Sequence, residues 1–439
     1  MKGSLTMAEQ VTLPQTAGGT NSGPAQIHGQ DAHAVNHGWR VTFAGMGINL
    51  ALGVLYTWSM FKAAIEKDFG WEGSRLNDPY ALCCLVFAFA MILAGRCQDK
   101  FGPRLTAFIG GLLVAAGMIL ISRTNNYAVW VLGFGVLVGT GIGFGYSSAT
   151  PPALKWFPPS KTGLIAGLVV AGFGLAPVYL APTSQKLLAL YGLQTSMLIF
   201  GVAFFVIVCG LAQLLVNPPA GYVVATKAGP AKPAAASSTP SQILRTLPFW
   251  LLWALYFIGS GAGLMVISSI SPMAKKSMGE YAFVAVAVMA VGNAAGRIGA
   301  GVLSDKIGRR WALMIVLLCQ AMLMFIAIPV TGSKDTAGVV IVLIASLIGF
   351  NYGANLSLFP SFTKDLWGLK SFGVNYGILF TAWGVGGFVF SRVQQTLVAG
   401  SATRSYASSF VLAGILLIVG GAMTFLIKPQ HPKIETAKA

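Results

Sequence analysis

The sequence predicts an all-α membrane protein whose twelve transmembrane helices form two pseudo-symmetric six-helix bundles. The first observation is composition: 55% of the 439 residues are hydrophobic and only 9% are charged, whereas soluble proteins carry about 25% charged residues. The second is that apolar segments of spanning length, about 17–25 residues, recur on both sides of a polar loop. The third is an internal repeat, which indicates duplication of a six-helix unit.

Each expected helix corresponds to one apolar segment. In the first half these segments are residues 41–63, 79–95, 105–123, 127–150, 162–182 and 192–216. In the second half they are residues 248–271, 282–303, 311–330, 338–359, 371–391 and 405–427.

The segments group into an N-terminal bundle, residues 40–216, and a C-terminal bundle, residues 247–428. Between them, residues 217–246 are rich in Pro, Ala, Ser and Lys, a composition typical of a flexible linker. Residues 1–39 are polar and lack the apolar core of a signal peptide. We therefore expect a disordered tail there and a second tail at residues 429–439.

The basic residues predict the orientation. If both termini face one side, the tails and loops on that side hold about 18 Lys and Arg, roughly twice as many as the opposite loops. Positive residues favour the cytoplasm, so we expect cytoplasmic termini in a protein of the plasma membrane (the inner membrane of the cell). No basic stripe interleaved with aromatics accounts for the net charge of +17, so the bilayer, and no nucleic acid, is the expected partner.

Several function classes are disfavoured. The five cysteines have no CxxC or Cys/His spacing, so we expect free thiols and neither a metal ion nor a cofactor. The spans contain no nucleophile or base constellation typical of an enzyme, and neither tail is long enough to be a signalling domain. Nothing resembles an ATP-binding domain, so any transport would be secondary. We expect a monomer.

Two pairs of motifs carry the repeat. GRCQDKFGPR begins at Gly95 and GVLSDKIGRR at Gly301, a displacement of 301 − 95 = 206 residues. GFGY begins at Gly143 and GFNY at Gly349, and 349 − 143 is also 206. Two matches at one displacement predict duplicated halves related by an axis along the membrane normal, with a binding site at the midplane between them.

The pattern G-x-x-x-D-[KR]-x-G-[RP]-R, present in both copies, resembles the signature of the major facilitator superfamily. Four further stretches resemble its oxalate/formate antiporter and monocarboxylate transporter branch: NLALGVLYTWSMF, KTGLIAGLVVAGFGL, NAAGRIGAGVLSDKIGRR and NYGILFTAWGVGG. The resemblance covers nearly everything from Arg40 to Pro429. It implies the major facilitator fold and secondary active transport by alternating access.

Arg297 is the one full charge that the sequence places deep in a span. It lies eight residues before Asp305, about 12 Å at ~1.5 Å per residue, and half of a bilayer core is about 15 Å. The position 206 residues earlier is Met91, so the charge is not part of the duplicated scaffold. A guanidinium can bind a carboxylate through two parallel hydrogen bonds, and the resemblance implies the same role. The structural alternatives are snorkelling to the interface or pairing with carbonyls at a helix C-terminus in the other half.

Polar and aromatic residues complete the candidate substrate site. Asn293 lies one turn before Arg297 on the same face, where it could bind substrate, orient the arginine or form an interhelical hydrogen bond. Tyr146 and Tyr352 end the repeated GFGY and GFNY motifs and could donate to a carboxylate or lie in an interfacial belt. The remaining candidates are Tyr56, Asn355, Phe359, Asn375, Tyr376 and Trp383.

The sequence departs from the branch at positions that bear on the substrate. The span-11 lysine of the oxalate exchanger is replaced by Trp383, and the aspartate that precedes the arginine in animal monocarboxylate transporters is replaced by Asn293. The span-1 lysine of those transporters is also missing between Val41 and Phe61. One midplane cation matches a monoanion better than a dianion, so lactate, pyruvate or a similar short monocarboxylate is the expected cargo.

Gating and coupling residues are also expected. Asp99 and Asp305 should pair with basic residues of the repeated loops, Arg104 and Arg309 among them, or cap a neighbouring helix, and so lock the cytoplasmic side. We expect proton symport, with the proton travelling through a peripheral group such as Asp78 or as the protonated acid. Electroneutral exchange of one carboxylate for another is the alternative.

Overall fold

The computed structural model describes residues 36–71, 73–76, 78–219, 222, 237–267, 278, 282–332, 338–401 and 405–427. The expected tail at residues 429–439 lies outside these ranges, as do most of the tail at 1–39 and of the linker at 217–246. Every long regular element within the described ranges is a helix, as expected for an all-α fold.

Within the described ranges, the first half contains seven α-helices, three short 3₁₀ helices (η1, η2 and η4) and one π-helix (η3). They are α1 (Gly38–Leu52), η1 (Gly53–Thr57), α2 (Trp58–Phe69), η2 (Gly73–Leu76), α3 (Asp78–Phe101), α4 (Pro103–Ile121), α5 (Tyr127–Trp130), η3 (Val131–Val138), α6 (Gly139–Lys155), η4 (Pro159–Lys161) and α7 (Thr162–Ala212). The second half comprises α8 (Pro240–Ile243), α9 (Leu247–Ile267), α11 (Ala282–Ile307), α12 (Arg309–Gly332), α13 (Gly338–Trp367), α14 (Phe372–Ala399), α15 (Ala407–Met423) and η6 (Thr424–Leu426).

Ten helices of the described ranges are long and apolar enough to cross a membrane. One of them contains α7, in which two consecutive helices meet at Gly192 with φ 72° and ψ 178°. The first expected span is divided by η1, so neither α1 nor α2 reaches the required length. Dividing α7 at Gly192 and joining α1 to α2 makes the fold consistent with the twelve expected spans.

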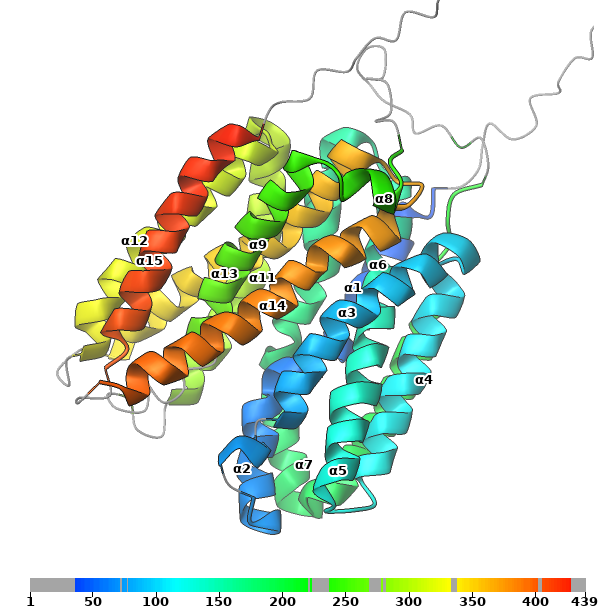
Figure 1. Ribbon diagram of the computed structural model, residues 1–439. Coiled ribbons are helices and arrows are strands. Elements are labelled where there is room, and N and C mark those ends of the chain that lie inside the picture. Colours follow the sequence, from blue (N-terminus) through cyan, green and yellow to red (C-terminus); the bar gives the residue numbers. More distant parts are fainter. Residues whose placement is uncertain are drawn as a thin grey trace, which may run out of the picture. The chain divides into compact units, whose positions relative to one another are not determined.

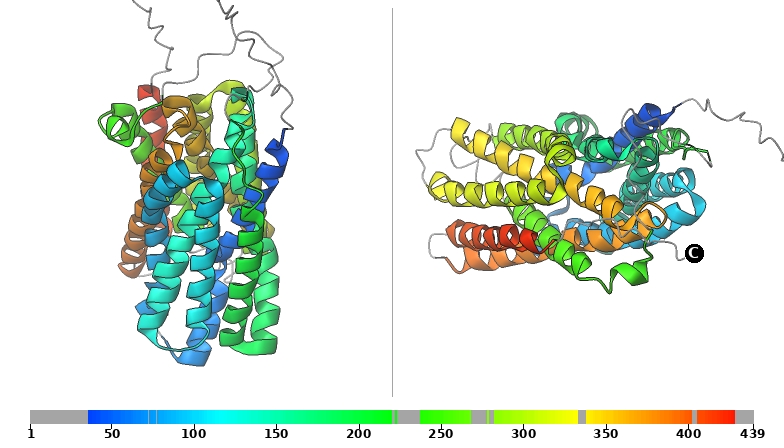
Figure 2. Two further views of the ribbon diagram at one scale, coloured as in Figure 1. Left: turned by 90° about the vertical axis from the view of Figure 1, so that its right-hand side faces the viewer. Right: turned by 90° about the horizontal axis from the view of Figure 1, so that it is seen from above.

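The described helices pack as one compact unit, in which contacts within each half of the sequence can be distinguished from contacts between the halves. In the first half, α1, α4 and α6 pack against α7 or one another; in the second half, α11, α12 and α13 pack together and α9 packs against α14. The main contacts between the halves are α7 with α11 and α3 with α14. Figure 1 shows α3 beside α14, and Figure 2 shows the helices of both halves in a view from above.

The two halves approach most closely on the side where α1 begins and η6 ends, which we call the terminal side. A Cβ atom on Gly95 of α3 would overlap the backbone of Gly373 at the start of α14. A Cβ atom on Gly301 of α11 would likewise overlap the backbone of Gly163 at the start of α7. Gly95 and Gly301 are the first residues of the two repeated motifs, so the repeat places glycine where the halves touch backbone to backbone.

These contacts predict that a side chain at Gly301 separates the halves on the terminal side. In Gly301→Val, the new methyl groups have no room against Gly163, and overpacking of this kind costs about 1–3 kcal/mol in a closed arrangement. Spin labels on the exposed residues Lys161 and Lys306, in a background without native cysteines, should report a longer distance in the variant.

Gly210→Val is the matched control, because a Cβ atom at Gly210 would meet no atom within 4 Å. Equal label distances in Gly301→Val and in the parent protein would contradict a glycine-dependent contact.

Candidate functional site

Arg297 is held in the interior by the packing of α11 between α7 and α13. Small residues make this packing tight: a Cβ atom on Gly167 of α7 would overlap the carbonyl oxygen of Arg297, and one on Gly353 of α13 would overlap that of Asn293. A Cβ atom on Gly174 would lie 3.1 Å from Nε of Arg297. The Arg297 side chain is 0% exposed, which excludes snorkelling to the interface.

The guanidinium of Arg297 is only partly satisfied. Its Nε donates to Oδ1 of Asn293 at 2.8 Å, and its Nη1 donates to the carbonyl oxygen of Val170 at 2.5 Å. Val170 belongs to α7, so the second bond joins the two halves, but it lies inside that helix and not at a C-terminus. Among the described residues, Nη2 forms no hydrogen bond of good distance and angle and the side chain has no ion pair, although Tyr56 and Tyr146 lie close enough for weak hydrogen bonding to the guanidinium. The protons of Nη2 and the second proton of Nη1 are therefore available to an anion.

Tyr56, Tyr352 and Trp383 form a hydrogen-bonded chain across the two halves. Nε1 of Trp383 donates to the hydroxyl of Tyr352 at 2.9 Å, and that hydroxyl lies 2.8 Å from the hydroxyl of Tyr56. Tyr352 and Trp383 are buried, whereas Tyr56 is half-buried. Tyr56 and Tyr352 also lie within electrostatic reach of Arg297, so the structure brings three predicted residues together beside the arginine.

Tyr146 and Tyr376 lie in an aromatic cluster beside this chain. The ring of Tyr146 contacts those of Phe87 and Phe173 at centroid distances of 5.5 and 5.6 Å. Tyr146 is within electrostatic reach of Arg297, and Tyr376 contacts Phe380 at 5.7 Å.

Three other predicted residues make no direct contact with Arg297 among the hydrogen bonds of the described residues. Nδ2 of Asn375 donates to the carbonyl oxygen of Ser238, just before α8. Nδ2 of Asn355 donates to the carbonyl oxygen of Asn351 in the same helix, α13, which belongs to the C-terminal half. Phe359 stacks on Tyr256 with 4.0 Å between ring centroids.

Sequence reasoning missed two contributors to the site. Val170 supplies only a backbone carbonyl, so its side chain carries no signal of the role. Tyr256 of α9 is fully buried and is within electrostatic reach of both Arg297 and Tyr146. It occurs in an ordinary aromatic run, WLLWALYF, which is also typical of a lipid-facing span.

The two aspartates of the repeated motifs cap helices of the opposite half. Both carboxylate oxygens of Asp99 accept from backbone N–H groups of Gly373 and Val374 at 3.0 and 3.1 Å, at the start of α14. Both oxygens of Asp305 accept from Gly163 and Leu164 at 2.9 and 3.0 Å, at the start of α7. A carboxylate is favourable there because a helix N-terminus carries unpaired N–H groups and a partial positive charge.

The two arginines expected beside these aspartates differ. Arg309 donates to Asp305 at 2.6 Å and to Asp365 at 2.8 Å. Arg104 donates instead to the carbonyl oxygen of Leu215 at 3.3 Å, within its own half. Asp99 therefore has a helix cap but no ion pair among the residues that the structure describes.

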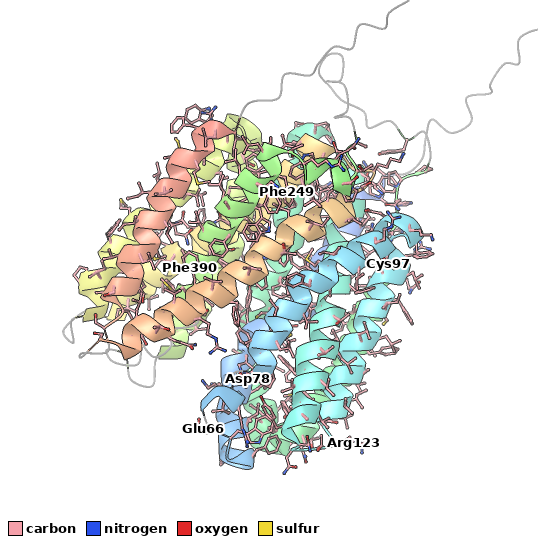
Figure 3. All side chains as sticks on the ribbon, viewed as in Figure 1. Glu66, Asp78, Cys97, Arg123, Phe249 and Phe390 are labelled. Atoms are coloured by element: carbon pink, nitrogen blue, oxygen red, sulfur yellow. The ribbon has the colours of Figure 1, made fainter. Side chains whose placement is uncertain are left out.

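On the side away from the termini, an open, shallow cavity of about 210 Å³ lies where α3, η3 and α14 meet. It is lined by residues of both halves, including Asp78, Leu82, Phe388 and Arg392. Oδ2 of Asp78 accepts from the hydroxyl of Tyr127 at 2.7 Å, and Figure 3 labels Asp78 at this end of α3. The halves are thus joined on the terminal side and leave a cavity on the other.

Comparisons with known proteins agree with this architecture. The family model described as Major Facilitator Superfamily matches residues 41–391. The oxalate:formate antiporter of Oxalobacter formigenes is 26% identical, over 86% of this chain and 88% of its own length. Apicoplast pyruvate carrier 1 of Toxoplasma gondii is 25% identical, over 81% of this chain and 83% of its own length. Monocarboxylate transporter 13 of Bos taurus is 24% identical, over 88% of this chain and 88% of its own length. Among solved structures, the E. coli fucose:proton symporter FucP matches with a TM-score of 0.65 at 15% identity, covering 89% of this chain and 98% of that one.

The incomplete pairing of Arg297 predicts that it costs stability in the empty protein. Burying a charge that has no ionic partner is costly, so Arg297→Met should keep or raise the thermal unfolding temperature of the purified protein. Asn293→Ala should lower it, because Nε of Arg297 then loses its partner. A marked fall in the unfolding temperature of Arg297→Met would instead show that the arginine stabilises the fold.

Proposed function

Because this chain belongs to the Major Facilitator Superfamily, we propose that it is a secondary transporter of small monocarboxylates such as lactate or pyruvate. The superfamily consists of membrane transporters, so the chain is a multi-pass membrane transporter and not an enzyme. The proposed mechanism is proton-coupled symport by alternating access. The termini and the linker then face the cytoplasm, and the protein acts in the plasma membrane.

The observation that carries the substrate class is the available edge of the Arg297 guanidinium. A cation that is fully buried and has no carboxylate beside it attracts an anion from solution. Its neighbours Tyr56, Tyr352 and Trp383 are neutral and offer hydroxyl or N–H groups. One positive charge among neutral donors suits one carboxylate, and relatives named for pyruvate and for monocarboxylates support that class.

The same geometry suggests how binding would permit movement. The Nη1–Val170 bond joins α11 to α7, and the two caps at Asp99 and Asp305 join the halves on the terminal side. The carboxylate of the cargo would compete with Val170 for the guanidinium protons and neutralise the buried charge. The halves could then rock until the cavity near Asp78 closes and the terminal side opens.

Substitutions of Arg297 should show how much of substrate binding depends on its positive charge and how much on the planar pair of guanidinium N–H donors. In proteoliposomes, we expect Arg297→Ala to abolish uptake of labelled pyruvate or lactate. Arg297→Lys keeps the charge but loses the planar pair of donors, and should reduce uptake by roughly tenfold to a hundredfold, the value of one charge-assisted hydrogen bond. Arg123→Lys, at an exposed position, is the matched control, and full activity of Arg297→Lys would contradict bidentate capture.

Proton coupling is tested by measuring whether an imposed proton gradient drives uptake of the substrate. An inward proton gradient should drive accumulation of the labelled monocarboxylate, and Asp78→Asn should lose that accumulation while retaining counterflow at equal pH. Asn can still accept the hydrogen bond from Tyr127, so the variant removes the titratable group with little change in packing.

Two other outcomes would revise the coupling. Accumulation that survives in Asp78→Asn would mean that the proton travels as the protonated acid. Counterflow without any response to the gradient in the parent protein would favour exchange of one carboxylate for another, as the name of the oxalate:formate antiporter suggests for that relative.

A further inference from the structure

Three phenol groups between the halves lack hydrogen-bond partners. Tyr146 of α6 is 2% exposed, Tyr256 of α9 is 0% exposed and Tyr376 of α14 is 3% exposed. None of their hydroxyls has a partner among the described residues. One of these tyrosines comes from the N-terminal half and two from the C-terminal half.

The three hydroxyls converge. The phenol of Tyr376 lies close enough to those of Tyr146 and Tyr256 for weak hydrogen bonding, but none of the three hydroxyls forms a hydrogen bond of good distance and angle. All three rings surround one residue, Phe380, at centroid distances of 5.5 Å for Tyr146, 6.0 Å for Tyr256 and 5.7 Å for Tyr376. Three hydroxyl groups thus lie near one another without a well-formed hydrogen bond between them.

The repeat explains why this cluster is unpaired while its counterpart is paired. Tyr146 and Tyr352 are repeat-related, but the hydroxyl of Tyr352 accepts from Trp383. The position 206 residues before Trp383 is Pro177, which has no side-chain donor. Tyr146 therefore lacks the internal partner that its counterpart has.

Leaving a buried hydroxyl without a partner is unfavourable, so three converging ones indicate that a polar atom normally fills the space. The occupant should be neutral, because the three groups are uncharged phenols. Arg297 lies within electrostatic reach of Tyr146 and Tyr256, and the carboxylate of the cargo would neutralise its charge. A carboxylate on Arg297 would place the atoms bonded to its α-carbon toward Tyr146.

We propose that Tyr146, Tyr256 and Tyr376 form a second polar subsite, which binds the oxygen on C2 of a 2-oxo or 2-hydroxy monocarboxylate. This assignment rests on the proposed function, because it takes the carboxylate to lie on Arg297. It identifies the specificity of the site: pyruvate and lactate bind in preference to propionate, which has the same carbon skeleton and no C2 oxygen.

The test compares these three acids as competitors of labelled pyruvate uptake into proteoliposomes. Parent protein should bind pyruvate or lactate at least about tenfold more tightly than propionate, because a site built to hydrogen-bond an oxygen rejects an analogue that lacks it. Tyr256→Phe and Tyr376→Phe should each reduce that ratio by about tenfold, mainly by weakening pyruvate and lactate. Tyr179→Phe is the matched control, because the Tyr179 hydroxyl donates to the carbonyl oxygen of Leu50 outside the site.

Folding is checked on the same variants. Removal of an unpartnered hydroxyl should leave the unfolding temperature of the empty protein unchanged or higher, while the extra stabilisation by pyruvate over propionate should disappear.

The outcomes distinguish the subsite from the proposed function. If Tyr256→Phe and Tyr376→Phe keep the parent ratio while Arg297→Ala abolishes uptake, the monocarboxylate assignment stands and the subsite is overturned, its hydroxyls holding water instead. If the parent protein neither transports these acids nor is stabilised by them, the proposed function fails and the subsite fails with it.

Discussion

The arrangement of the interior depends on one cost, that of burying the Arg297 guanidinium. A charge away from water is tolerated only where donors and acceptors compensate for its lost hydration. Here Asn293 and the Val170 carbonyl compensate for part of it and leave Nη2 without a partner. The glycines Gly167 of α7 and Gly353 of α13 allow these helices to contact the backbone of α11 at Arg297 and Asn293. The unpartnered Nη2 would only destabilise a protein that binds nothing there, whereas in a transporter it can donate to the substrate.

Each copy of the repeated motif contains two functional positions, a glycine and an aspartate, that lie one helical turn apart. Gly95 and Gly301 permit backbone contact with the opposite half, and Asp99 and Asp305, four residues later, cap the helix that is contacted. Each motif thus aligns a small residue and an acceptor on the same helix face. The two copies differ in their ion pairs. Asp305 pairs with Arg309, whereas Asp99 accepts hydrogen bonds only from backbone N–H groups among the described residues.

The sequence was sufficient for the features that depend on composition and spacing. Hydrophobicity predicts the long apolar helices, and the single charge in an apolar run predicts an interior Arg297, which is 0% exposed. The domain boundaries and the depth of Arg297 in the membrane stay predictions. Features that depend on tertiary packing were not accessible. Val170 acts through a carbonyl that every residue has, and Tyr256 differs from other apolar-span tyrosines only in what surrounds it. Asn375 was grouped with the substrate site because it lies near Tyr376, yet its amide faces Ser238, since neighbours in a helix point about 100° apart.

The closed terminal side has an energetic consequence. At the two glycine contacts no interlocking side chains must be withdrawn, so separation exposes little apolar surface. The backbone N–H groups bound to Asp99 and Asp305 contribute to the barrier to reopening on this side, and water can replace those acceptors as the helices part. Contacts that are polar, few and replaceable by solvent keep two arrangements of similar free energy, and a small ligand can shift a balance of that kind.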